Sequence, residues 1–178
     1  MNLVSLFRTR ERLRILEHVM SREGLRVTDI AKELNVSKGL VSKFMRTLHD
    51  NGIVKRSDGA VYSPSDSYAA RQVRKIINLS KVNLRRIDRK MIDGIGIYGS
   101  WARGTNTIES DADVWVKAEE YPSQEYLARL SAQLRRMLGC EIRLLVLTPA
   151  KTRELVKDDV FFSALTRDSV LLWGEDIA

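Results

Sequence analysis

Apolar positions in the first third of the chain recur every three or four residues, in short runs separated by turn residues. This spacing predicts an amphipathic helix over residues 8–20. Thr28 is the expected N-cap of a second helix over 29–34, because a threonine hydroxyl can accept a bond from one of the free backbone N–H groups at a helix start. Ser37 is expected to cap a third helix in the same way. The pattern therefore predicts a group of short helices at the N-terminus.

A β-hairpin is predicted directly after the third helix. Two short β segments, 53–56 and 60–62, flank Ser57-Asp58-Gly59, a composition typical of tight turns. The order of helix, short helix, turn, helix and hairpin resembles the winged helix-turn-helix of prokaryotic regulators. The resemblance is carried by the stretch VTDIAKELNVSKGLVSKFMRTLHDNGIVKR. We expect this domain to occupy residues 1–65.

The resemblance implies that the N-terminal domain binds double-stranded DNA. In such domains the outward residues near the start of the third helix face base edges, and basic residues around them meet phosphates. The residues expected to do so, on the third helix and on the wing, are Ser37, Lys38, Ser42, Lys43, Arg46, Lys55 and Arg56. Winged helices also serve as dimerisation and protein-docking modules, and the sequence leaves that alternative open.

Charge is distributed unevenly along the chain. Residues 1–92 hold 20 Lys or Arg and 9 Asp or Glu, a net charge of +11, whereas residues 93–178 carry a net charge of −4. The stretch 66–92 has an apolar stripe at helical spacing and a net charge of +6. We interpret it as a basic helical linker that packs on the C-terminal half. Its charge indicates either a solvated helix face or contact with nucleic acid or substrate phosphates.

The sharpest motif lies in the C-terminal half, where a short apolar strand runs into a Gly-Ser turn. Gly99-Ser100 precedes a short helical stretch, and Ser110-Asp111-Ala112-Asp113 opens the next apolar strand. Two carboxylates at positions i and i+2 of a strand point to one face, where they are suited to holding a hard divalent cation. A Gly-Ser turn that opens a helix exposes backbone N–H groups and a hydroxyl to a phosphate. Together they predict a site for Mg²⁺ (or Mn²⁺) and a nucleoside triphosphate.

This motif closely resembles the signature of the polymerase-beta-like nucleotidyltransferases in their minimal form. The match consists of Gly99, Ser100, Arg103, Gly104, Ser110, Asp111 and Asp113, in the order and at the spacing of that family. The rest of the half agrees, with a helix predicted over 126–138, a strand over 141–147, a helix from 148 and a final β segment over 169–174. The fold class expected for the whole chain is α+β, with a winged helix followed by a mixed sheet flanked by helices over 93–178.

The resemblance implies an enzyme that transfers a nucleoside monophosphate, with ATP as the expected donor, to an acceptor hydroxyl. The residues assigned in this way are Gly99, Ser100, Arg103 and Ser110 for the nucleotide, and Asp111 and Asp113 for the metal and catalysis. For Arg103 two interpretations stay open, a contact with phosphate and a brace for the Gly-Ser turn. Small members of the family resemble antitoxins that adenylylate a toxin, so a protein is the expected acceptor and a homodimer the expected assembly.

A third carboxylate usually completes such sites from a later strand, and the sequence leaves its assignment open. The candidate is Glu141, in CEIRLLVL, which would help to activate the acceptor hydroxyl. The register is ambiguous by two residues, and if Arg143 occupies the position the third carboxylate is missing. Because Glu141 and Arg143 share a strand face, an ion pair is the alternative to a catalytic role. The alternative function is a DNA-binding regulator with a non-catalytic, nucleotide-sensing or dimerising half.

The remaining composition narrows the location of the protein. No apolar run approaches the roughly 20 residues of a membrane-spanning helix, and the first residues lack the pattern of a signal peptide. The single cysteine, Cys140, excludes an internal disulfide framework and a multi-cysteine zinc site. We therefore expect a cytoplasmic protein without membrane contact.

Overall fold

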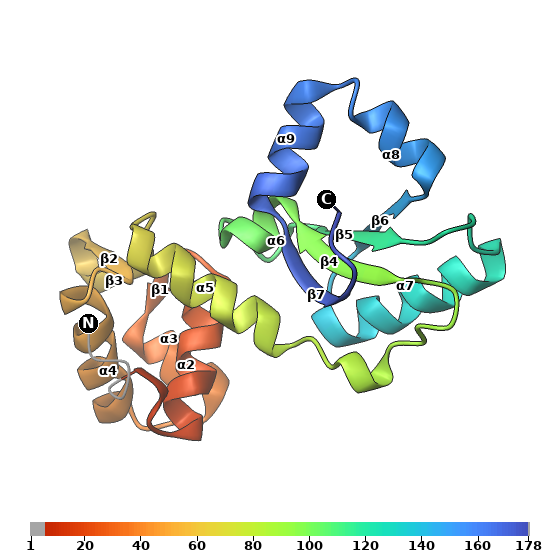
Figure 1. Cartoon of the computed structure of the whole chain (residues 1–178). Helices are drawn as coiled ribbons and strands as arrows, with labels where there is room; N and C mark the ends of the chain where they lie inside the picture. Colours follow the sequence, from red (N-terminus) through yellow and green to blue (C-terminus); the bar gives the residue numbers. More distant parts are fainter. Residues whose placement is uncertain (1–5, 178) are drawn as a thin grey trace. The chain divides into compact units, whose positions relative to one another are not determined.

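The computed structural model describes residues 6–177, apart from the side chain of Asp159. The first five residues, on which the expectation about a signal peptide partly rests, lie outside the described part. The chain divides into two compact units, one that ends at Ile77 and one that begins at Asn78, shown in Figure 1. The division falls inside the stretch interpreted as a linker. Within residues 6–177, no helix combines the length and the apolar character needed to cross a membrane.

The first unit is a helix-turn-helix with a small antiparallel sheet in the order β1-β3-β2. Its apolar stripes meet in one core, which includes the fully buried Ile15, Leu16, Ile30, Phe44 and Leu48. This arrangement confirms the predicted winged helix. Its elements are α2 (Arg10–Met20), β1 (Leu25–Arg26), α3 (Val27–Leu34), α4 (Lys38–Asp50), β2 (Val54–Ser57), the 3-10 turn η1 (Asp58–Ala60) and β3 (Val61–Pro64).

Of the two predicted helix caps, one is confirmed and the other is wrong. Ser37 caps α4 as predicted, because its hydroxyl accepts a hydrogen bond from the N–H of Leu40. The prediction that Thr28 caps the second helix is wrong. That helix begins at Val27, and its N-cap is Arg26, whose side chain makes no capping bond. The reason is that the chain enters α3 directly from β1, so strand pairing rather than a threonine hydroxyl sets the start.

The sheet of the first unit is larger than the predicted hairpin. The short strand β1, which was not predicted, pairs with β3 through Leu25 opposite Tyr62. The connection between β2 and β3 is the 3-10 turn at Asp58–Ala60 instead of a tight turn at 57–59. The wing is therefore the outer part of a three-stranded sheet.

The stretch interpreted as a linker is divided between the units. The helix α5 (Tyr68–Ser80) completes the core of the first unit, whereas the expectation was packing on the C-terminal half. The residues that decide this lie three and four positions apart and are buried in that core: Ala70, Val73 and Ile77. The following 3-10 turn η2 (Leu84–Arg86) leads into the second unit, in whose core Ile87 and Ile92 are buried.

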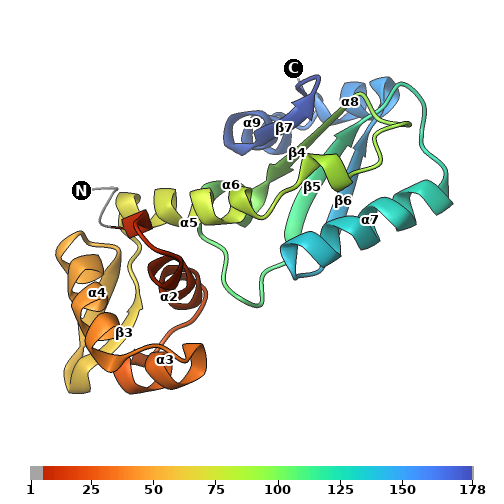
Figure 2. The same ribbon diagram turned by 90° about the horizontal axis from the view of Figure 1, so that it is seen from below.

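The second unit is a four-stranded mixed sheet in the order β6-β5-β4-β7, with helices on both faces. Strands β5 and β6 are parallel, and the other pairs are antiparallel. Figure 2 shows α7 along one face and α8 and α9 beyond the other. The elements are β4 (Gly94–Tyr98), α6 (Gly99–Arg103), β5 (Ala112–Lys117), α7 (Gln124–Leu138), β6 (Ile142–Leu147), α8 (Pro149–Leu155), α9 (Asp159–Asp168) and β7 (Val170–Gly174).

Alternation along β5 decides which side chains meet which helices. Val114 and Val116 pack with Leu130 of α7 on one face. Trp115 points to the other face, where it packs with Leu165 of α9. Asp113 lies two residues before Trp115 and therefore shares the face of α8 and α9. The α+β class predicted from the sequence is confirmed.

Candidate active site

The turn between β4 and α6 lies directly against the start of β5. Gly99, its first residue, has a φ of +67°, and a Cβ at this position would collide with the carboxylate of Asp113. Antiparallel pairing sets Tyr98 opposite Asp113, which explains the close approach. Glycine is therefore required here both by the backbone angle and by the neighbouring carboxylate.

The two aspartates of the motif flank Ala112 at the entrance to β5. Asp111 lies one residue ahead of the strand and Asp113 within it, so both side chains belong to the same face. Burial raises the pKa of Asp113; Arg143 opposes the rise, and Asp111 adds to it. Burial also raises the pKa of the Tyr98 phenol, and Asp113 adds to that rise. The carboxylate of Asp113 is thus short of solvation, and a cation brought to it would stabilise its charged form.

Arg143 occupies the register position beside these carboxylates. Parallel pairing of β5 and β6 sets Arg143 opposite Asp113. Its guanidinium lies 2.6 Å from an oxygen of Asp111, the distance of a charge-assisted hydrogen bond. The neighbour of Asp113 on the next strand is therefore a cation, which is the arrangement that the sequence left as the alternative.

Glu141 lies one residue before β6, with its side chain exposed. Its carboxylate pairs with Arg135 of α7, and its backbone carbonyl accepts a hydrogen bond of 2.9 Å from Ala112. The alternative of an ion pair between Glu141 and Arg143 is wrong in its partners, because Arg143 pairs with Asp111. Glu141 nevertheless lines the same cleft as Asp111, a groove of about 470 Å³.

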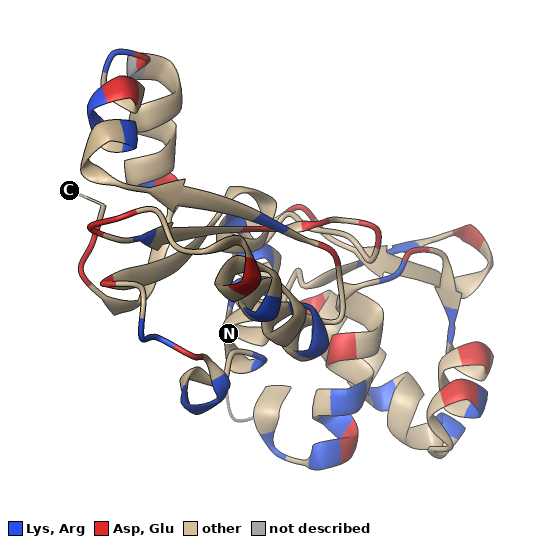
Figure 3. Cartoon of the chain, turned by 90° about the vertical axis from the view of Figure 1, so that its right-hand side faces the viewer, with Lys and Arg blue, Asp and Glu red and all other residues tan. Residues whose placement is uncertain are grey.

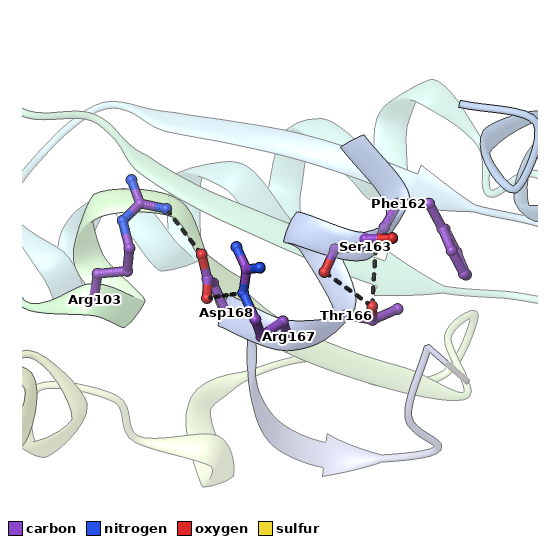
Figure 4. A network of polar contacts seen from close by, with 6 residues as sticks. All are labelled: Arg103, Phe162, Ser163, Thr166, Arg167 and Asp168. Atoms are coloured by element: carbon purple, nitrogen blue, oxygen red, sulfur yellow. Dashed lines mark hydrogen bonds and ion pairs between the residues drawn. The ribbon is translucent and has the colours of Figure 1, made fainter. Parts of the chain in front are cut away.

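Arg103 and Ser110 are both engaged within the protein. The guanidinium of Arg103 lies 3.8 Å from Asp168, at the end of α9, and Asp168 also pairs with Arg167 (Figure 4). Ser110 accepts a hydrogen bond of 2.9 Å from the N–H of Thr107 with its hydroxyl. Both residues therefore hold the loop and helix around the turn in place.

Sequence reasoning missed two residues of this neighbourhood. Tyr98 directly precedes the Gly-Ser turn, and alternation along β4 would have indicated that it shares the face of Asp113. Asp168 carries no signal in the sequence. It reaches Arg103 because β7, which follows it, pairs with β4 and brings the end of α9 beside α6.

The seven residues predicted to face DNA are exposed. They lie at the start of and along α4, and on β2, as Ser37, Lys38, Ser42, Lys43, Arg46, Lys55 and Arg56. Figure 3 shows the Lys and Arg positions of the chain in blue. Arg56 lies with its guanidinium 5.9 Å from the ring centroid of Tyr62, which orients it on the wing.

Part of the basic charge of residues 66–92 is used inside the protein. The guanidinium of Arg74 is buried and donates to the backbone carbonyl of Met20. Arg89 lies 4.5 Å from the ring centroid of Trp173. These contacts favour a structural role for some of the residues in the basic stretch, whereas Arg85 and Arg86 are exposed.

The donor set at the entrance to β5 fits a magnesium ion bound together with a nucleotide. Mg²⁺ in such sites takes one or two protein carboxylates, and phosphate oxygens and water supply the other ligands. Asp111 and Asp113 provide two carboxylates beside a glycine turn. In the described part of the chain, no group of three or more His, Cys, Asp or Glu side chains lies close enough together to hold a metal ion. A cation here would have two protein carboxylates, and water or phosphate oxygens would supply its other ligands.

Fold and site define a protein of two parts, a helix-turn-helix fused to a nucleotidyltransferase domain. Residues 60–165 match the family model of the nucleotidyltransferase domain, and residues 9–56 match that of the bacterial regulatory proteins of the arsR family. The chain belongs to the nucleotidyltransferase family and is a nucleotidyltransferase that transfers a nucleoside monophosphate.

Two curated relatives and one solved structure are similar to parts of this chain. The protein adenylyltransferase MntA of Thermococcus cleftensis is 31% identical over 81 residues, which are 46% of this chain and 80% of the relative. A candidate protein adenylyltransferase of Methanocaldococcus jannaschii is 33% identical over 76 residues, 42% of this chain and 74% of the relative. A crystal structure of a toxin–antitoxin with AMP-PNP is 25% identical, with a TM-score of 0.39, and the match covers 57% of this chain and 73% of that one.

Proposed function

We propose that this protein transfers AMP from ATP to a hydroxyl group of a protein partner, with Mg²⁺ or Mn²⁺, and that its winged helix binds double-stranded DNA. The observation that carries the proposal is the close packing of Gly99 against Asp113, which joins the glycine turn and the carboxylate pair into one site. The names of the two relatives, both protein adenylyltransferases, support AMP as the transferred group and a protein as the acceptor.

Different residues of the chain would bind the phosphates and the metal. Gly99 and Ser100 offer backbone N–H groups and a hydroxyl to the β- and γ-phosphates. Asp111 and Asp113 would hold the cation, which would supply charge neutralisation at the phosphates and so make the departing pyrophosphate a better leaving group. Because little covalent chemistry is required of the protein, its contribution is positioning: the donor α-phosphorus is held in line with the acceptor oxygen.

Arg103 and Ser110 stabilise the elements that carry this site. Arg103, paired with Asp168, keeps α6 beside α9, and a guanidinium at this place also lies within electrostatic reach of Asp113. Ser110 holds the loop that carries Asp111. We assign both to nucleotide binding through the shape of the turn.

Glu141 is the candidate for accepting the proton of the attacking hydroxyl. It lines the cleft beside Asp111 and would have to leave Arg135 to act. We expect Glu141→Gln to leave ATP affinity nearly unchanged and to reduce turnover by roughly two orders of magnitude, the scale of general-base loss. Equal transfer by both proteins would make Glu141 a structural residue.

The DNA-binding part rests on the exposed residues of α4 and β2. A helix-turn-helix that binds as a homodimer reads two half-sites about one helical turn apart. We infer that this protein binds as a homodimer to a twofold-symmetric site, and that an enzyme and a regulator are combined in one chain.

The experiment that tests the proposal is incubation with labelled ATP and Mg²⁺, with and without the product of the neighbouring gene. Label should pass to that protein, and the double variant Asp111→Asn, Asp113→Asn should transfer none while it keeps its fold. Transfer by the double variant at the wild-type rate would contradict the metal assignment.

A second candidate function is a regulator that binds nucleotide without transferring it. Arg143 favours this candidate, because it stands opposite Asp113 where a third carboxylate would complete the site. If neither wild type nor Glu141→Gln labels any acceptor while both bind DNA, the regulator is the correct assignment.

A further inference from the structure

A fixed positive charge lies inside the predicted metal site. The guanidinium of Arg143 contacts Asp111 at 2.6 Å and is near enough to Asp113 and Tyr98 to influence both. A divalent cation that binds Asp111 therefore meets a competitor already bound to the same carboxylate.

We propose that Arg143 is the counter-ion of Asp111 in the metal-free protein. Its guanidinium must move away from Asp111 before a divalent cation can bind there. Arg143 therefore sets the affinity of the site for the cation. The inference rests on the proposed function, since it concerns the same two aspartates. Neither the motif nor the family match assigns Arg143 a role in cation binding.

The surroundings of Arg143 allow this exchange. Its side chain is 73% exposed, whereas that of Asp111 is 29% exposed. Arg143 can therefore turn into solvent without disturbing packing, while the carboxylate stays in place. The other guanidinium near the site is different, because Arg103 contacts Asp168, a carboxylate outside the motif.

The exchange also explains what Arg143 does in each state. Without metal, its charge offsets the repulsion between Asp111 and Asp113, which lie on the same strand face. With a metal bound, the guanidinium would turn into solvent, and the charge of the cation would offset the two carboxylates in its place.

The test is a titration of the full-length protein with Mn²⁺ alone, without nucleotide, followed by the electron paramagnetic resonance of the free ion. We expect Arg143→Gln to bind Mn²⁺ about fivefold more tightly than wild type, the scale of one solvent-exposed ion pair. Arg143→Lys keeps the charge and should stay near wild type. Arg143→Asp adds a third carboxylate and should bind more tightly than Arg143→Gln.

A matched control removes an arginine of similar exposure elsewhere. Arg129 is paired with Glu125 on α7, and its side chain is 60% exposed. Arg129→Gln should leave Mn²⁺ affinity unchanged, which separates a local effect from the general loss of one positive charge. Thermal unfolding of each variant checks that the fold is intact.

The outcomes separate this inference from the proposed function. If Arg143→Gln binds Mn²⁺ as wild type does, or more weakly, the counter-ion role is overturned. If Arg129→Gln tightens binding as much as Arg143→Gln, the effect is not local and the inference also fails. Loss of Mn²⁺ binding in Asp111→Asn, Asp113→Asn upholds the metal site in either case, whereas unchanged binding in that double variant overturns the proposed function itself.

Discussion

Gly99 carries two constraints that usually occur at separate positions. Its positive φ places it in the left-handed region, which costs other residues energy. In addition, the carboxylate of Asp113 fills the space of its missing side chain. A substitution at this residue should therefore damage both the backbone of the turn and the carboxylate on the next strand.

We expect Gly99→Ala to weaken metal-dependent ATP binding at least tenfold and to lower the free energy of unfolding by more than about 1 kcal/mol. The matched control is Gly139→Ala. Gly139 has a similar φ of +75° but open space around its Cβ position, so it should lose only about 1 kcal/mol and keep ATP binding. Urea unfolding and nucleotide titration measure both effects, and equal losses in the two variants would contradict the role of Gly99.

His18 is a buried histidine placed between a cation and a carboxylate. Its side chain lies between Arg22, whose guanidinium donates to Nδ1, and Glu33, 3.3 Å from Nε2. Because Nδ1 accepts, the ring proton is on Nε2. Burial lowers the pKa of His18, Arg22 lowers it further, and Glu33 opposes this. The folded state therefore binds a proton less readily than the unfolded chain.

This pKa shift predicts that acid destabilises the first unit. As the pH falls below about 6.5, the unfolded chain takes up a proton that the folded unit rejects, so the free energy of unfolding decreases by at most about 1.4 kcal/mol per pH unit. The His18→Gln variant should lose this dependence, and His49→Gln, on the exposed end of α4, should keep it. Urea unfolding at pH 5.0, 6.0 and 7.5 would decide; an unchanged slope in His18→Gln refutes the assignment.

At the scale of elements, α4 and the wing present two kinds of polar residue. Ser42 lies on the exposed face of α4, where we propose that its hydroxyl contacts a base edge. Lys55 is exposed on β2, where we propose that its ammonium group contacts the phosphate backbone. The two positions should therefore contribute differently to sequence preference.

We expect Lys55→Ala to weaken binding to all DNA sequences about equally and to reduce the slope of log K against log salt by about 1. Ser42→Ala should change the preference among sequences and leave that slope unaltered. Fluorescence anisotropy at several salt concentrations, on a duplex from the protein's own promoter and on a scrambled duplex, measures the salt slope and the sequence preference. Binding that does not depend on salt would instead indicate a protein-docking module.

At the scale of the whole molecule, each unit has hydrophobic packing of its own, and the two proposed activities divide between the units. Phe44 is buried in the core of the first unit, and Leu130 in that of the second. Residues 9–56 and residues 60–165 each match a family model of their own. The units should therefore lose stability separately.

We expect Phe44→Ala to cost about 3–5 kcal/mol in the first unit and to abolish DNA binding while ATP binding remains. Leu130→Ala should cost about 2–5 kcal/mol in the second unit. This variant should lose ATP binding and keep DNA binding. Thermal unfolding followed by circular dichroism, with both binding assays on each variant, tests this. A single transition shifted equally by both substitutions would show that the units unfold together.

Much of the fold and part of the site could be predicted from the sequence because their signals are local. Helix periods, the Ser37 cap and the i, i+2 spacing of Asp111 and Asp113 depend on neighbours within a few residues. The start of α3 could not be predicted in this way, since the pairing of β1 with β3 moves it ahead of Thr28. The unit on which α5 packs could not be predicted either, because an apolar stripe does not indicate which core it will cover.

The sequence by itself determined the two-part organisation, the winged helix, and the turn and carboxylates around Gly99. Tertiary structure decided which residue of β6 stands beside Asp113. A shift of one residue would have turned every side chain to the other face, and the apolar pattern excludes it. A shift of two residues keeps every side chain on its face, so the pattern cannot distinguish Glu141 from Arg143. The pairing of β5 with β6 selects Arg143, and the end of α9 supplies Asp168 to Arg103.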